Sequence, residues 1–425
     1  MLRTTLFCSL LASFVATLSC GPSARDCVGD NCGDDGSGGS GGSGGGNGSC
    51  TYDPNAYDIP GNGIDDDCDG IVDNPPGPCD MGLNAASTDP GDFAKAIDIC
   101  QVSNGSNWGL VSATYTLADG TSSPAANQHY IGPEFGTGVM PKEGASLGIL
   151  ATGAVRGNGG ENGWADYGDE SASVNSSAFP SDWLAANNGQ LPSAPGCPAP
   201  NGNTANSPIM LTLKIKVPDN VNSFTMDVNF FSSEFPVWVC SPFNDFFVEL
   251  LDSTYSGSDA NPADKNLAFY SPDMGVTKYP VGVNLAHGST GLFTQCQNGA
   301  TGCGKDPLDG NAVPGTISTC TSIGELAGTG LEQAASEDPC DSNSLSGGGT
   351  GWLQTSGNLT PGETMTLRVA IWDTSDFALQ SLAVIDNFAW NGSAAPPGTT
   401  IFVDKEPGPT LQNRSQAETS TLEAN

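Results

Sequence analysis

The strongest constraint on the fold is a strict alternation of apolar and polar residues in three segments. "IMLTLKIKV" (209–217), "SFTMDVNFF" (223–231) and "TMTLRVAIW" (364–372) place apolar side chains at every second position. Because successive side chains of a strand point to opposite faces, this period of two is typical of strands with a buried face. Further short apolar segments predict strands at 110–117, 147–155, 245–251, 266–270, 281–286 and 382–390.

The segments between these strands are rich in Gly, Pro, Asn and Ser, which favour turns and loops. This pattern predicts an all-β fold: a jelly-roll-like β-sandwich with a few peripheral helices and long disulfide-stapled loops. The longest loops are expected at 156–207 and 288–350. One helix is predicted in "STDPGDFAKAIDIC" (87–100), where Asp89 can serve as N-cap and Pro90 can occupy the first turn.

The N-terminal segment has the features of an export signal. Its apolar run from Leu6 to Val15 is too short to span a bilayer as a helix, and small residues precede Cys20. We therefore predict a signal peptide and lipidation of Cys20, with simple cleavage as the alternative. No other apolar run is long enough to span a membrane, so the expected membrane contact is the lipid anchor alone. The expected location is the outer membrane or cell surface, or the exterior as a secreted protein.

Composition divides the rest of the chain. The Gly/Ser-rich stretch 33–49 cannot bury apolar surface and is typical of a flexible linker. The predicted organisation is a signal peptide (1–19), a lipid-anchored tether (20–49), a small Asp-rich metal-binding module (50–80), the β-sandwich (83–392) and a disordered tail (393–425).

The charge balance excludes one class of partner. The chain has 47 acidic and 13 basic residues and a formal net charge of −34, whereas nucleic-acid binding requires a positive surface. The excess of carboxylates favours divalent cations, or serves solubility. Of fourteen cysteines, twelve remain outside the signal and Cys20, and in an exported chain these are expected to form disulfides. Two histidines in the whole chain argue against zinc.

"GIDDDCDGIVDN" (63–74) predicts a calcium loop, because alternate aspartates on a tight turn can direct their oxygens to one point. Gly70 falls where such loops turn sharply, and Pro76 stands where a bidentate Glu is usual. Asn62 or Asp58 would complete the coordination shell. An acidic turn that binds no ion tightly is the alternative. The predicted metal ligands are Asp65, Asp67, Asp69, the backbone carbonyl of Ile71, Asp73 and Asp58.

Residues 65–73 resemble the core of the MopE-type metal-binding repeat of bacterial exported proteins. The family's naming implies copper, but copper prefers imidazole or sulfur, and His129 and His287 are distant in sequence. Oxygen ligands favour Ca²⁺ over copper. Three further segments, 147–157, 230–251 and 367–390, resemble the choice-of-anchor L domain over 83–392. That resemblance implies a surface or secreted location and architecture, and no activity.

A second acidic cluster is predicted from carboxylates on or beside strongly apolar strands. Such carboxylates must be paired, hydrogen-bonded or metal-bound if they are buried, because a bare buried charge is costly. Solvated acids at strand ends are the alternative. The residues concerned are Glu234, Asp245, Asp373, Asp376 and Asp386.

These features together predict a non-catalytic binding or adhesion module supported by calcium, with a glycan or matrix ligand. The alternative is a secreted hydrolase that uses Glu234 and Asp245 as a carboxylate pair, which requires an open cleft. "GASLG" (144–148) matches a nucleophile elbow around Ser146, with His287 as its base. However, such an elbow lies between a strand and a helix, and the sequence around Ser146 does not predict that order. A metal-scavenging protein would be expected to repeat its binding loop.

Overall fold

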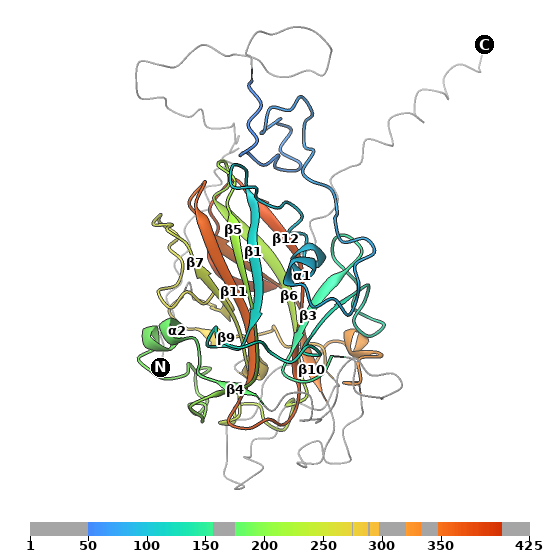
Figure 1. Ribbon diagram of the computed structural model, residues 1–425. Coiled ribbons are helices and arrows are strands. Elements are labelled where there is room, and N and C mark those ends of the chain that lie inside the picture. Colours follow the sequence, from blue (N-terminus) through green and yellow to red (C-terminus); the bar gives the residue numbers. More distant parts are fainter. Residues whose placement is uncertain are drawn as a thin grey trace, which may run out of the picture. The chain divides into compact units, whose positions relative to one another are not determined.

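A computed structural model describes residues 50–155, 175–273, 275–287, 290–296, 320–332 and 347–401 (Figure 1). The predictions of a signal peptide, of lipidation at Cys20 and of a tether to residue 49 therefore lie outside the described residues, as does the tail from 402. The expected loops 156–207 and 288–350 lie partly outside them.

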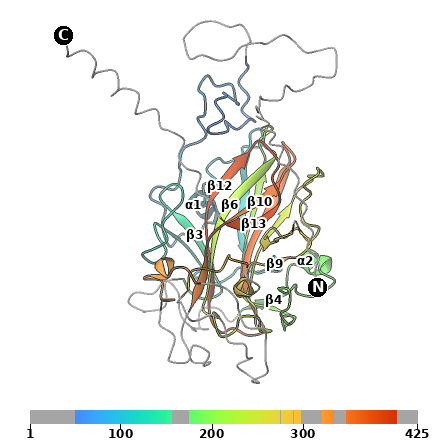
Figure 2. The ribbon, with the colours of Figure 1, turned by 180° about the vertical axis from the view of Figure 1, so that it is seen from behind.

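The fold is an antiparallel all-β sandwich, as the alternation predicts. One sheet has the strand order β1-β5-β11-β7, with β4 paired to β5. The other has the order β13-β10-β6-β12-β3-β2, and Figure 2 shows it from behind. The first sheet comprises β1 (Gly109–Thr116), β4 (Ser176–Ser177), β5 (Ala205–Lys216), β7 (Phe246–Asp252) and β11 (Thr364–Thr374). The second comprises β2 (His129–Gly132), β3 (Leu147–Ala151), β6 (Ser223–Ser232), β10 (Gly348–Asn358), β12 (Ser381–Asn391) and β13 (Gly398–Ile401).

The remaining elements are short and lie beside the sheets. β8 (Phe269–Tyr270) pairs with β9 (Tyr279–Pro280). The helices are α1 (Pro90–Ala96), α2 (Ser181–Ala186) and the 3₁₀ helices η2 (Val283–Ala286) and η3 (Gly324–Leu326). Asp89 caps α1 as predicted, because its side chain accepts a hydrogen bond from the backbone N–H of Gly91. No helix within the described ranges is long and apolar enough to cross a membrane.

Alternating side chains build the core between the sheets. Leu211 and Leu213 of β5, Val228 of β6 and Val369 of β11 are fully buried in one cluster. The opposite face of the first sheet is also covered, because Trp183 of α2 packs with β7 and β11 there. Strands covered on both faces read as nearly continuous apolar runs, which explains the sequence of β7.

Two predictions about elements were wrong, and one strand was missed. The predicted strand 281–286 is wrong, because Val283–Ala286 form the 3₁₀ helix η2, although their side chains are buried. Strand β10 was not predicted, because Gly348 and Gly349 interrupt the alternation; a Cβ at these positions would approach Phe293 and Phe231 to 2.5 and 2.6 Å. The disorder expected from residue 393 is wrong for Gly398–Ile401, because β13 pairs with β10.

The Asp-rich segment 50–80 belongs to the same compact unit as the sandwich. Residues 55–57 bind the turn between β5 and β6: the N–H of Asp219 donates to Asn55 O (2.8 Å), and Tyr57 exchanges two hydrogen bonds with Asn220. Trp108 Nε1 donates to Ala56 O (3.0 Å). The disulfides among the described residues are Cys50–Cys68, Cys79–Cys100, Cys197–Cys240 and Cys296–Cys320.

Candidate metal site

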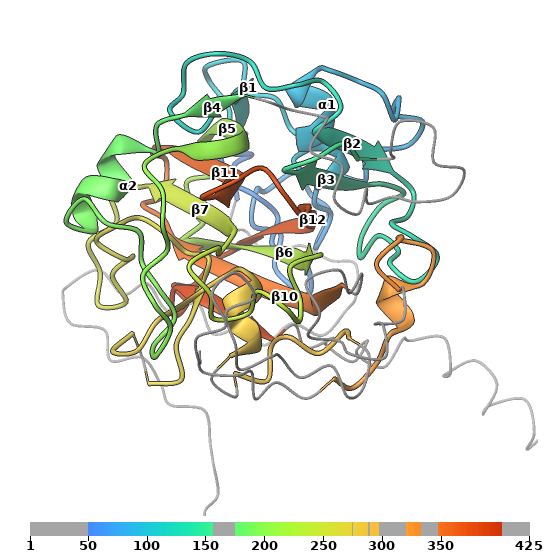
Figure 3. The same cartoon turned by 90° about the horizontal axis from the view of Figure 1, so that it is seen from below.

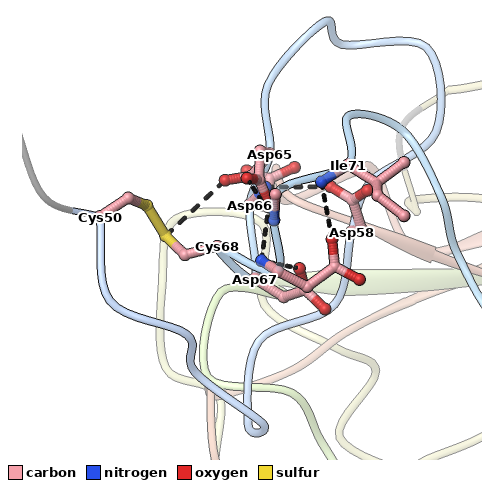
Figure 4. Close-up of a disulfide and its surroundings, with 9 residues drawn as sticks. Cys50, Asp58, Asp65, Asp66, Asp67, Cys68 and Ile71 are labelled. Carbon is pink, nitrogen blue, oxygen red and sulfur yellow. Dashed lines mark hydrogen bonds between the residues drawn. A yellow bond between two sulfur atoms is a disulfide. The ribbon is translucent and has the colours of Figure 1, made fainter. Parts of the chain in front are cut away.

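The aspartate loop brings three of its predicted ligands together. Asp65, Asp67 and Asp69 each offer one carboxylate oxygen, and these oxygens lie within 4.8 Å of one another. Figure 4 shows this part of the loop beside the Cys50–Cys68 disulfide, which ties the middle of the loop to Cys50. The chain reverses at Gly70, whose φ of 98° is a conformation that side chains with a Cβ rarely adopt. The sequence pattern thus predicted the convergence correctly.

Backbone amides hold the three carboxylates in place. Asp65 accepts hydrogen bonds from the N–H groups of Asp69 (3.1 Å) and Gly70 (3.0 Å). Asp67 also accepts from Asp69 N–H (3.1 Å), and Asp69 accepts from Ile71 N–H (2.8 Å). The loop is therefore preorganised by its own turn, with the acidic oxygens on one side.

The structure places the other predicted ligands differently. Asp58 is buried, and its carboxylate accepts hydrogen bonds from the backbone N–H groups of Asp66 and Asn74. Asp73 accepts from the N–H groups of Asn62 and Gly63. Both side chains brace the path of the loop, because they satisfy amides that the turn leaves without partners. The converging set therefore comprises Asp65, Asp67 and Asp69, and coordination by Asp58, Asp73 and the Ile71 carbonyl stays a prediction; the Ile71 N–H donates to Asp69.

The electrostatics of the loop fit a hard cation. Partial desolvation raises the pKa of Asp67, and the nearby charges of Asp69, Asp58 and Asp65 raise it further. A polar hollow of about 160 Å³, lined in part by Asp58, Asp67 and Asp69, adjoins these oxygens. Calcium takes six to eight oxygen ligands and would neutralise this cluster, with solvent completing the shell.

The donor set does not fit copper. Neither described histidine joins the aspartates: His129 stacks on Tyr115 with ring centroids 4.3 Å apart, and His287 lies with Cys197 and Cys240. Those two cysteines form a disulfide. The oxygen-only loop therefore matches the chemistry of Ca²⁺.

Three residues of the second predicted cluster do meet. Glu234, Asp245 and Asp373 are 3%, 1% and 3% exposed, and burial raises the pKa of each, that of Asp245 to about 7. Asp376 is near enough to raise these pKa values further. Its own Oδ1 accepts a hydrogen bond from Ala378 N–H.

The structure separates Asp386 from this group. It lies within β12, where its carboxylate accepts hydrogen bonds from the N–H groups of Lys142 and Asn387. Burial, with the charge of Asp98 adding to it, raises the pKa of Asp386 to about 8. The prediction that Asp386 joins the second acidic cluster is therefore corrected.

Sequence reasoning missed three fully buried acids, Asp80, Asp227 and Glu249. Glu249 in "FFVELL" is fully buried, and a lone charge within so apolar a run is the signal that could have found it. Asp80 is also fully buried and accepts hydrogen bonds from the N–H groups of Ala145 (2.6 Å) and Ser146. Strand β3 follows Ser146 directly, whereas a nucleophile elbow is followed by a helix.

The fold and site define an all-β sandwich that carries an acidic loop tied by a disulfide. Comparison with family models, with curated proteins and with solved structures found no match.

Proposed function

We propose that this is an exported, lipid-anchored cell-surface protein whose calcium-supported β-sandwich acts as a non-catalytic binding or adhesion module. The observation that carries the proposal is the convergence of Asp65, Asp67 and Asp69 within 4.8 Å on a loop tied by a disulfide. Like charges so close repel one another, and a bound Ca²⁺ would replace that repulsion with attraction.

Calcium would act on the sandwich through the contacts of the Asp-rich segment. Asn55 and Tyr57 are hydrogen-bonded to the turn between β5 and β6, one strand from each sheet. A stiffened loop would therefore limit the motion of that turn. The ion has a structural role in this proposal and takes no part in a reaction.

A groove of about 310 Å³ is the surface that we propose for a glycan ligand. Trp352, Gln295 and Glu325 line it, and Lys142 Nζ lies 5.6 Å from the centroid of the Trp352 ring. An aromatic ring beside amide, carboxylate and ammonium groups offers both stacking and hydrogen bonding to a sugar. Glu234 and Asp245 are instead buried, so no observation favours the alternative carboxylate-pair hydrolase.

The calcium role is tested by thermal unfolding of the full chain with Ca²⁺ and with EDTA. At a Ca²⁺ concentration one hundred times the Kd, binding should add about 2.7 kcal/mol to the free energy of unfolding. The variant D65N/D67N/D69N should lose the part of this gain that the loop supplies. The control variant D119N/D259N/D273N, which neutralises three exposed aspartates elsewhere, should keep it. Equal melting temperatures of the unaltered chain with EDTA and with Ca²⁺ would refute the calcium role.

The binding role is tested on a glycan array, with Ca²⁺ and with chelator. Trp352→Ala should abolish a glycan signal that the unaltered chain gives with Ca²⁺. Trp238→Ala is the matched control, because Trp238 packs against Phe243 and does not line the groove. Absence of any glycan signal under both conditions, or its survival in Trp352→Ala, would count against the groove.

A further inference from the structure

The buried carboxylates lie where four chain segments meet at one end of the sandwich. Glu234 follows β6, Asp245 precedes β7, Asp373 lies near the end of β11, and Ser381 begins β12. Figure 3 shows these four strands from below. Because β6 and β12 belong to one sheet and β7 and β11 to the other, the cluster bridges the two sheets.

This end of the sandwich is far from the aspartate loop. The turn that binds residues 55–57 leads into Ser223, and the ten residues of β6 then run to Ser232, two residues before Glu234. Ten strand residues span roughly 30 Å. The cluster is therefore separate from the candidate calcium loop.

The side chains of the cluster face one another. The Ser381 hydroxyl lies 2.6 Å from Asp245 Oδ2, and the N–H of Thr374 donates to Asp245 Oδ1 (3.4 Å). Asp245 and Asp373 are close enough for each to change the pKa of the other. Burial raises the pKa of Glu234, and the nearby charges of Asp245 and Asp373 raise it further.

Two oxygens in this cluster have no hydrogen-bond partner. Glu234 Oε2 and Asp373 Oδ1 are both inaccessible to solvent, on side chains of residues that are only 3% exposed. A buried carboxylate oxygen without a hydrogen-bond partner destabilises the folded chain, because it has lost its hydrogen bonds to water and gained none in the protein. The ion pairs within the described ranges involve Asp92, Asp182 and Asp252 and do not reach the cluster.

We propose that Glu234, Asp245 and Asp373 form an internal divalent-cation site that takes Ca²⁺. The unpartnered oxygens Glu234 Oε2 and Asp373 Oδ1, with Asp245, supply hard ligands of the type that Ca²⁺ prefers.

The ion also changes the geometry of the cluster. In the described structure the oxygens of this trio do not all lie within 4.8 Å of one another, as those of Asp65, Asp67 and Asp69 do. The ion would bring the three carboxylates closer together and would link β6 and β12 to β7 and β11 at this end.

Native mass spectrometry of the full chain counts bound Ca²⁺ and separates the two sites. The loop variant D65N/D67N/D69N should retain one Ca²⁺ per chain, and its combination with E234Q/D373N should bind none. The combination with E249Q is the control, because Glu249 is equally buried and lies outside the cluster; it should retain the ion.

Two outcomes would overturn the internal site. The first is a loop variant that binds no Ca²⁺ at saturating concentration and pH 8, a result that does not depend on whether E234Q/D373N folds. The second is one ion retained in the combined variant with near-ultraviolet circular dichroism like that of the unaltered chain. Failure of the loop proposal alone gives a different result: the unaltered chain binds one ion, which the loop variant keeps and E234Q/D373N loses.

Discussion

Glu249 offers a direct test of how this sandwich accommodates acids in its core. Its neighbours at every second position of β7, Phe247 and Leu251, belong to the cluster between the sheets, so its side chain points into that core. Thr355 of β10 and Asp227 of β6 are near enough to affect its pKa. Neither carboxyl oxygen makes a hydrogen bond of ordinary geometry, although the Thr355 hydroxyl is close enough to lower the pKa slightly.

The sign of the pH dependence follows from this burial. Burial, with the charge of Asp227 adding to it, raises the pKa of Glu249 from 4.5 to about 8. A carboxyl group whose pKa is raised on folding contributes stability that is fully present below its unfolded pKa and is lost as the pH rises through its folded pKa. Each unit of difference is worth about 1.4 kcal/mol, so the total loss, from below both pKa values to above both, amounts to about 5 kcal/mol.

Replacement of Glu249 by Gln should remove this dependence, because the amide stays neutral. Urea unfolding of the two proteins at pH 5 and at pH 8.5 gives the four free energies needed. We expect the variant to gain about 4 kcal/mol relative to the unaltered chain between these pH values. Asp119→Asn, at an exposed position, is the control and should show no such gain. A difference between E249Q and the unaltered chain that is the same at both pH values would refute the reasoning.

Three further substitutions test the local structure, each by urea unfolding at pH 6. Asp89→Ala removes the cap of α1 and should cost about 1 kcal/mol, whereas Asp89→Ser should restore most of it. Gly148→Ala places a Cβ 2.4 Å from the ring of Phe93 and should cost about 1–3 kcal/mol. Leu213→Ala empties part of the core between the sheets and should cost about 2–5 kcal/mol. An unchanged unfolding midpoint in any of the three would contradict the packing or capping assigned to that residue.

The sequence predicts the strands whose buried positions carry apolar side chains at every second residue. It does not predict strands that lack this alternation. β5, β6 and β11 follow the alternation because side chains at every second position pack between the sheets. In β10, Gly348 and Gly349 pack so closely against aromatic rings that a Cβ would clash with them. Because glycine has no side chain, these positions do not show the apolar alternation. In 281–286 apolar residues are buried by a 3₁₀ turn, because burial alone does not require a strand.

Some features of the two candidate sites could likewise be predicted from the sequence, and others could not. Spacing predicts the meeting of Asp65, Asp67 and Asp69, because a tight turn fixes it locally. It does not predict that Asp58 and Asp73 are used by backbone amides, because that depends on the path of the whole loop. Asp245 and Asp373 meet Glu234 because all three lie near strand ends at one edge of the sandwich.

The misplaced acid has a similar explanation. Asp386 lies five residues beyond Ser381 along β12, a distance of roughly 16 Å along a strand. Asp386 and Ser381 are therefore near in sequence but far apart in space, because each residue of an extended strand lies farther along the strand than the one before it. Residues in one strand share a site only when they lie within a few positions of each other.

The buried acids imply that the folded chain holds protons at neutral pH that the unfolded chain releases. Glu249 and Asp386 each have a pKa raised to about 8, so at pH 7 both are largely protonated when folded and ionised when unfolded. Unfolding at pH 7 should therefore release about two protons from these groups. Calorimetry in phosphate and in Tris measures the release, because the two buffers take up protons with different enthalpies. E249Q should lower the release by about one proton. Equal unfolding enthalpies in both buffers would mean that these carboxyl groups are already ionised in the folded chain. That result would contradict the inference that burial keeps them protonated at pH 7.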